Sequence, residues 1–294
     1  MTFTQLEVFA ALARAGSFSR AAALLGITQS AVSHALRALE GELQVQLVRR
    51  EGIHSPLTDA GARLLQRAND ILQQQEALRQ EADAERGIAR GTLRVASFGA
   101  TSSLRLLPLL IAEYRRRQPA VQVQVDERND DTVVRWLLER RVEIGFVVLP
   151  DERFETLPLV EDELVALLPA AHRLAGQRSI AAADLQGEPF IRTSAGSGAQ
   201  IDRFLAEAGA LPDAIYHFEQ ISSMLGFVAQ GHAVAIAARL AVPEEPPAGM
   251  VYRSLSPRQR RVTGLAVRNL QRLSPAAAGF VALAQEMARQ KRFG

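Results

Sequence analysis

The sequence predicts an α/β protein in three parts: a small helix-rich N-terminal domain, one long linker helix, and two α/β lobes. Short alanine-rich amphipathic runs occupy the N-terminal part. An apolar repeat with a period of seven follows them. Beyond it, strand-like and helix-like segments alternate, which is typical of parallel strands joined by crossover helices. The expected domains are residues 1–58, 59–90 and 91–294.

Composition and charge set the class of protein. The 294 residues carry 34 Lys and Arg against 32 Asp and Glu, and they contain no cysteine. A disulfide framework, a thiolate nucleophile and a cysteine zinc site are therefore excluded. No apolar run reaches the roughly 18 residues that a membrane span needs, and the N-terminus lacks a basic segment before an apolar core. We expect a folded cytoplasmic protein without a membrane partner.

The stretch SFSRAAALLGITQSAVSHALRALE, residues 17–40, contains two helices separated by Gly26. Ser17 is the expected N-cap of the first and Thr28 of the second, because both are followed by helical apolar spacing. Ile27 is expected to be a buried anchor in the turn. Two helices joined by a tight glycine turn, the second with a polar outer face, are typical of a helix-turn-helix whose second helix enters the major groove of DNA.

The expected DNA contacts lie on this second helix and on the hairpin, or wing, that follows it. A glutamine such as Gln29 can pair with adenine, and serine or threonine hydroxyls can bond phosphate. The predicted set is Thr28, Gln29, Ser30, Ser33, His34, Arg37, Arg49, Arg50 and His54. The alternative is a solvated polar face on a small bundle, since residues 1–58 have five arginines against four glutamates, a formal +1. The motif, not the charge, favours DNA.

A helix is expected from Thr58 to about Arg86, with an apolar seam along it. Leu57, Leu64, Ile71 and Leu78 fall seven residues apart, and Gly61, Ala68, Gln75 and Ala82 follow them by four. Such a repeat predicts a coiled coil that pairs two chains. The alternative is an amphipathic helix packed within one chain, since Gly61 and Gln75 interrupt the seam.

The remaining segments predict two α/β lobes with a cleft between them. Lobe I is expected over about 91–161 and 267–294, and lobe II over about 162–266. Strand-like pieces are expected at 157–161 and 163–169. Three loops, at 98–103, 192–200 and 219–224, each join a strand to a helix and converge on the cleft. Backbone N–H groups at such helix starts favour an anion; the alternative is that the hydroxyls there serve only as helix caps.

The combination LEVFAALARAGSFSRAAALLGITQSAVSHALRALEGEL, a wing leading to PLTDAG, a long helix and lobes beginning near GTLRVASF resembles the LysR-type transcriptional regulator family. The resemblance implies a regulator with periplasmic-binding-protein-like lobes that binds double-stranded DNA, a small-molecule effector and RNA polymerase, and assembles as a dimer of dimers. The effector positions it implies are Thr101, Ser102, Ser103, Val148, Thr193, Ser194, Ile221 and Ser222. Some members of the family have an arginine where this chain has Val148. The absence of that arginine argues against a dicarboxylate effector of the kind that those members bind. Ser30 and His34 stand where many members have proline and arginine.

Catalysis is the competing class. The histidines His34, His54, His172, His217 and His232 show no metal-ligand spacing. There is no G-x-S-x-G elbow, Walker loop or complete G-x-G-x-x-G. We therefore expect neither an enzyme nor a cofactor or metal. A solute-binding protein of similar two-lobed fold is the other alternative, which the extra N-terminal domain disfavours. The effector, the operator and the direction of regulation stay open.

Overall fold

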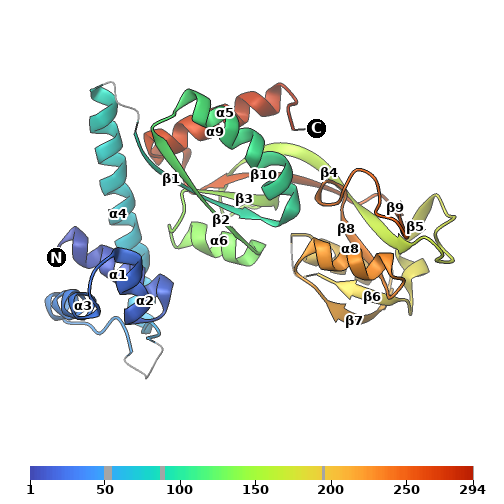
Figure 1. Cartoon of the computed structure of the whole chain (residues 1–294), viewed down its shortest axis with the longest axis horizontal. Helices are drawn as coiled ribbons and strands as arrows, with labels where there is room; N and C mark the ends of the chain where they lie inside the picture. Colours follow the sequence, from blue (N-terminus) through green and yellow to red (C-terminus); the bar gives the residue numbers. More distant parts are fainter. Residues whose placement is uncertain (50–54, 87–89, 194–195, 294) are drawn as a thin grey trace. The chain divides into compact units, whose positions relative to one another are not determined.

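The computed structural model describes residues 1–49, 55–86, 90–193 and 196–293. The chain divides into two compact units (Figure 1). The first unit is Met1–Gly91 with Leu138–Arg141, and the second is Thr92–Leu137 with Val142–Gly294. Within the described ranges, no helix is long and apolar enough to cross a membrane.

Three helices build the N-terminal domain: α1 (Phe3–Ala15), α2 (Phe18–Leu25) and α3 (Gln29–Leu43). The hydroxyl of Ser17 accepts from Arg20 N, and that of Thr28 from Ala31 N, so both expected N-caps are confirmed. Gly26 ends α2 at φ 65°, a left-handed conformation that glycine adopts without strain. The core includes the fully buried Leu12, Val32, Leu36 and Leu39. Ile27 is 40% exposed, so its expected role as a buried anchor is wrong.

The long helix α4 (Asp59–Glu85) begins at the Thr58 cap. Thr58 Oγ1 donates to Gln46 O at 2.7 Å, and Thr58 N donates to Leu47 O at 3.0 Å. At Gly61 an added Cβ would lie 2.9 Å from the carbonyl carbon of Leu47 and closer still to its oxygen. The glycine that interrupts the apolar seam therefore lets α4 approach the backbone after α3.

Lobe I of the second unit has a central sheet with helices on both faces (Figure 1). Its strands are β1 (Gly91–Phe98), β2 (Val121–Arg128), β3 (Ile144–Leu149) and β10 (Arg260–Val267). Its helices are η1 (Thr101–Leu106, a π-helix), α5 (Leu107–Arg117), α6 (Asp130–Leu138), η4 (Leu270–Arg272) and α9 (Pro275–Arg289). On one face α5 contacts α9, where the rings of Tyr114 and Phe280 lie 5.2 Å apart and Tyr114 Oη donates to Ala276 O at 2.8 Å. On the other, α6 packs so closely that a Cβ at Gly145 would meet Leu137 Cδ1 at 2.7 Å.

Lobe II is built on the second half of β4 (Glu155–Pro169). Its other strands are β5 (Ser179–Ala181), β6 (Pro189–Arg192), β7 (Asp213–His217), β8 (Val234–Ala238) and β9 (Met250–Ser256). Its helices are η2 (Ala182–Leu185), α7 (Gly198–Glu207), α8 (Ile221–Ala229) and η3 (Arg239–Ala241). The strand order over both lobes is β2-β1-β3-β10-β4-β8-β6-β7. Since β4 pairs first with β10 and then with β8 and β9, it passes from one lobe into the other.

The structure corrects the expected strand pattern in two places. The pieces expected at 157–161 and 163–169 are one continuous strand, β4. Asp162, which lies between the two expected pieces, does not interrupt the strand and is buried against Arg261 of β10. The expected end of lobe II at residue 266 is also wrong, because Val262–Ala266 of β10 pair with β3 of lobe I. A strand that returns to the first lobe has no local signal that distinguishes it from a strand of the second.

Candidate functional site

The polar face of α3 is presented to solvent, as a reading helix requires. Gln29, Ser30, His34 and Arg37 are exposed, and Ser33 is half-buried. The Thr28 hydroxyl lies 2.9 Å from that of Ser30, which adds to the order of the first turn of the helix. The backbone N–H groups of this turn and the side chains above them form a set of donors suited to phosphate and base edges.

Two side chains on this face have defined orientations. Arg37 Nε donates to Ser33 O at 3.2 Å, one turn earlier along the helix. Ser19 Oγ donates to Gln29 Oε1 at 3.3 Å, which links α2 to the start of α3. In the wing, Arg49 N donates to Pro56 O at 2.8 Å, next to a bridge between Val48 and Leu57. Arg49 is exposed, whereas Arg50 and His54 lie outside the described residues.

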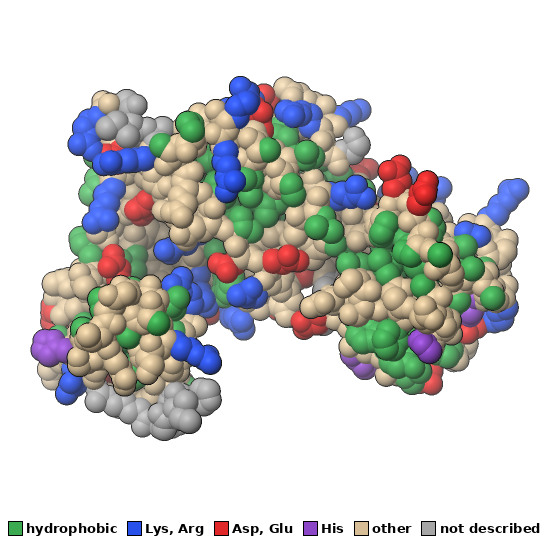
Figure 2. Space-filling model, in the orientation of Figure 1, with side chains coloured by type: hydrophobic (Ala, Val, Ile, Leu, Met, Phe, Trp, Pro, Cys, Tyr) green, Lys and Arg blue, Asp and Glu red, His purple; other side chains and the backbone are tan. Residues whose placement is uncertain are grey.

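Surface charge adds little to the case for DNA. On the face shown in Figure 2, basic and acidic side chains are interspersed over both units rather than gathered into one broad region of a single sign. This distribution agrees with the near balance of 34 Lys and Arg against 32 Asp and Glu in the sequence. The helix-turn-helix geometry, rather than a basic surface, is therefore the feature that points to DNA.

The four apolar positions of the α4 seam divide into two pairs. Leu57 and Leu64 are half-buried and pack against the core of the N-terminal domain. Ile71 is 36% exposed and Leu78 is 67% exposed. The first half of the seam therefore serves the fold of its own chain, and the second half presents apolar side chains to solvent.

Between the lobes lies a cavity of about 630 Å³. It brings together most of the predicted effector positions, because Thr101, Ser103, Thr193, Ile221 and Ser222 all line it. They come from the end of β1 and η1, from the end of β6, and from the start of α8. Open α/β sheets bind ligands at such carboxyl ends of strands.

Two of the predicted positions are placed differently, and a third cannot be placed. Ser102 is fully buried and does not line the cavity; its hydroxyl bonds with Phe98 O and accepts from Ser97 Oγ at 2.9 Å. The expected loop at 98–103 is helical from Gly99 onward, which turns that hydroxyl back toward β1. Val148 also lies outside the lining, in β3 opposite Thr263 of β10. Ser194 is outside the described residues.

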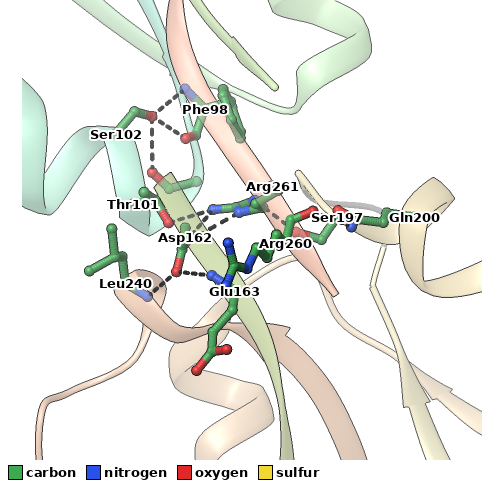
Figure 3. A network of polar contacts seen from close by, with 11 residues as sticks. Phe98, Thr101, Ser102, Asp162, Glu163, Ser197, Gln200, Leu240, Arg260 and Arg261 are labelled. Atoms are coloured by element: carbon green, nitrogen blue, oxygen red, sulfur yellow. Dashed lines mark hydrogen bonds and ion pairs between the residues drawn. The ribbon is translucent and has the colours of Figure 1, made fainter. Parts of the chain in front are cut away.

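A buried arginine that the sequence analysis missed, Arg261, also lines the cavity. Figure 3 shows its polar contacts. The Arg261 side chain is 3% exposed, and its Nη2 and Nε each lie 3.2 Å from Asp162 Oδ2, whose own side chain is 1% exposed. Its Nη2 also donates to Thr101 Oγ1 of lobe I, and its Nη1 to Ser197 Oγ of lobe II, both at 2.7 Å. The available signal was that Arg261 directly precedes the largely apolar run of β10, since an arginine buried there would need a partner.

Burial perturbs two ionisable groups at this junction. Desolvation lowers the pKa of Arg261, against the opposing charge of Asp162. Burial likewise raises the pKa of Asp130, whose Oδ1 accepts from Gly196 N at 2.7 Å and so connects α6 of lobe I with the loop before α7 of lobe II. In that loop Gly196 has φ 51°, and a Cβ at Gly198 would lie 3.5 Å from the carbonyl carbon of Thr193 and closer to its oxygen.

The arrangement offers hydrogen-bond donors and an apolar wall. Phe98, Met224 and Ile236 supply part of the apolar lining. Within the described ranges, no three His, Cys, Asp or Glu side chains are grouped so that they could hold a metal ion. The cavity is therefore suited to reversible binding of a small molecule.

Comparison with known proteins extends over both units. Residues 3–62 match the family of bacterial regulatory helix-turn-helix proteins of the lysR family, and residues 86–289 match the LysR substrate binding domain. The chain is 33% identical to the uncharacterized HTH-type transcriptional regulator YvbU of Bacillus subtilis, over 98% of this chain and 99% of the relative. It is 35% identical to the probable HTH-type transcriptional regulator LrrA of Synechococcus elongatus, over 91% of this chain and 90% of that one.

Solved structures show the same fold. A full-length OxyR variant from Pseudomonas aeruginosa matches with a TM-score of 0.73 at 24% identity, covering 98% of this chain and 95% of that one. CbnR in complex with its target DNA matches with a TM-score of 0.63 at 24% identity, covering 97% of this chain and 99% of that one. The chain belongs to the LysR family of bacterial transcriptional regulators, with a DNA-binding helix-turn-helix domain followed by an effector-binding domain.

Proposed function

We propose that this regulator recognises its operator mainly through the exposed face of α3. The observation that carries the proposal is the set of exposed polar side chains, from Gln29 to Arg37, on a helix whose start is fixed by the Thr28 cap. The contacts comprise Thr28, Gln29, Ser30, Ser33, His34 and Arg37 on α3, with Arg49, Arg50 and His54 of the wing on the sugar-phosphate backbone. Gln29 and Ser33 read base edges or nearby phosphates, and Arg37 adds charge.

The proposed assembly is a pair of chains joined along α4, with two such pairs forming a dimer of dimers. Leu78 and Ile71 support it, since their exposed apolar surface would be buried in a coiled coil with a second copy. Leu57 and Leu64 lie on the same seam and are only half-buried in their own chain, so their remaining exposed surface would extend the proposed contact. Paired chains would carry two reading helices, which must fit grooves about 34 Å apart or a multiple of that distance.

Regulation is proposed to come from a small molecule held between the lobes. Of the proposed positions, Thr101, Ser103, Thr193, Ile221 and Ser222 line the cavity, which supports them, while Ser194 adjoins Thr193 in the chain. Bound effector would change the relative orientation of the lobes and, through the assembly, the half-sites that are engaged. The regulator would act in the cytoplasm, where it would also meet RNA polymerase.

The test compares two double variants in fluorescence anisotropy with the DNA upstream of the regulator's own gene. Gln29→Ala with Ser33→Ala should lower specific affinity about 10- to 100-fold, because losing one good base contact, that of Gln29, costs roughly 1–3 kcal/mol. The control, Gln177→Ala with Ser179→Ala, removes the same two side-chain types at exposed positions of lobe II and should bind like the parent. Equal affinity of both double variants would contradict the assignment of α3.

A further inference from the structure

The cavity contains a buried cation whose charge is already cancelled. Among the described residues that line the cavity, Arg261 is the buried basic side chain. Asp162 lies against Arg261, and both side chains are almost fully buried. The guanidinium has five N–H groups. Four of them are engaged by Asp162, Thr101 and Ser197, which leaves one Nη1 N–H without a partner among the described residues. This N–H can donate to a ligand, but it carries no uncompensated charge.

Arg128 is the other basic side chain among the described residues that line the cavity. Arg128 is exposed, pairs with Asp126 at 3.9 Å, and lies over the Trp136 ring at 5.3 Å. Glu127 and Glu219 also line the cavity. The charged side chains among the described lining residues are two arginines and two glutamates, a formal sum of zero. Asp162, which pairs with Arg261, adds a negative charge next to this lining.

The N-termini of helices at the cavity supply hydrogen-bond donors, but they do not supply a full positive charge that could balance a bound anion. Neither α7 nor α8 has a side-chain cap on its first turn, so backbone N–H groups there are available to an acceptor on a ligand. A helix start stabilises a nearby anion only modestly. Burying an ion without a partner costs more free energy than that. The helix starts alone therefore do not offset the burial of an anion here.

We propose that Asp162 sets the charge selectivity of this cavity, so that it takes an uncharged or cationic small molecule with hydrogen-bond acceptors and an apolar part, and excludes anions. The inference rests on the proposed effector site and revises the anion expected from the loop pattern. It assigns Arg261 as a charge-compensated donor that connects Thr101 of lobe I with Ser197 of lobe II, and Asp162 as the residue that compensates its charge.

Succinate and succinamide test the proposal, because they share a four-carbon skeleton and differ in charge. Their affinities for the full chain are measured by titration calorimetry at constant ionic strength. The parent should not bind succinate more tightly than succinamide. Asp162→Asn leaves Arg261 as an unpaired buried cation and should raise succinate affinity at least about tenfold, since an anion then restores the lost pairing. Tighter succinate than succinamide binding by the parent, or no gain in a folded Asp162→Asn variant, would overturn the proposal.

Two further variants keep the result decisive. Glu163→Gln removes the same formal charge from the next residue of β4, whose carboxylate points away from Arg261 in Figure 3, and should leave succinate affinity at the parent value. The double variant Asp162→Asn with Arg261→Gln leaves no uncompensated charge buried, and it covers the case in which the single variant does not fold. It should respond to succinate as the parent does; weaker binding than the parent would show that Arg261 already holds an anion. The calorimetric assay contains no DNA. A negative result for charge selectivity therefore does not bear on operator recognition, and a loss of operator binding does not bear on charge selectivity.

Discussion

Replacing Gly61 by alanine should loosen the junction between α4 and the N-terminal domain. In an exposed helix interior this change normally stabilises a protein by about 1 kcal/mol. Here the new Cβ would lie 2.9 Å from the carbonyl carbon of Leu47 and still nearer its oxygen, so helix and backbone must separate. The separation weakens two hydrogen bonds from Thr58, each contributing about 0.5–1.5 kcal/mol, and the packing of Leu65 and Ala68. We expect a net loss of roughly 2–4 kcal/mol after the helix-propensity gain.

Gly41→Ala is the matched control for this prediction. Gly41 lies within α3, and a Cβ there would have nothing within 4 Å, so alanine should stabilise the domain by about 1 kcal/mol. Hydrogen exchange of peptides from α1 to α4 in the full chain measures both effects. Exchange should be faster in Gly61→Ala and slower in Gly41→Ala than in the parent. Unchanged exchange in Gly61→Ala, or equal loss of protection in both variants, would refute the steric argument.

Three more predictions concern exposed or buried groups. Leu78→Glu places a charge on the exposed seam and should shift the protein toward monomers in sedimentation velocity; an unchanged assembly would contradict pairing through α4. Asp130→Asn should be more stable than the parent to urea at neutral pH. Burial raises the folded-state pKa of Asp130, so the parent loses stability as pH rises through that pKa, and the variant does not. The advantage of the variant should therefore vanish below the ordinary Asp pKa of about 3.9. A pH-independent difference would contradict that cause. Arg261→Met leaves Asp162 buried without its cation and should lower the free energy of unfolding by roughly 3–5 kcal/mol. Unfolding is monitored by the fluorescence of Trp136, the only tryptophan of the sequence. A loss below about 1 kcal/mol would contradict the importance of the pair.

Local signals predicted the N-terminal domain well. The caps at Ser17 and Thr28 and the turn at Gly26 depend on residues within a few positions of one another, so one stretch of sequence specifies them. Gly61 has no such signal. A glycine is required at position 61 because of the contact with Leu47, 14 positions earlier. In the sequence, Gly61 only interrupted the apolar repeat.

The cavity between the lobes was predicted less completely, because part of it depends on contacts between residues far apart in the sequence. Its loops were located because each follows a strand, and Thr101, Thr193 and Ser222 line the cavity as expected. The Asp162–Arg261 pair was missed because its partners are 99 residues apart and join only when β10 returns beside β4. The buried orientation of the Ser102 side chain was missed because the helical start at Gly99 resembles a loop in sequence.

The central claim is tested most directly by the binding of the purified full chain to the DNA upstream of its own gene, against a scrambled duplex, over a salt series. Contacts to phosphate alone give affinities that fall together with salt for both duplexes. Recognition by α3 predicts a preference for the upstream DNA that persists as salt rises. Equal affinity for the two duplexes at every salt concentration would contradict specific recognition by this regulator.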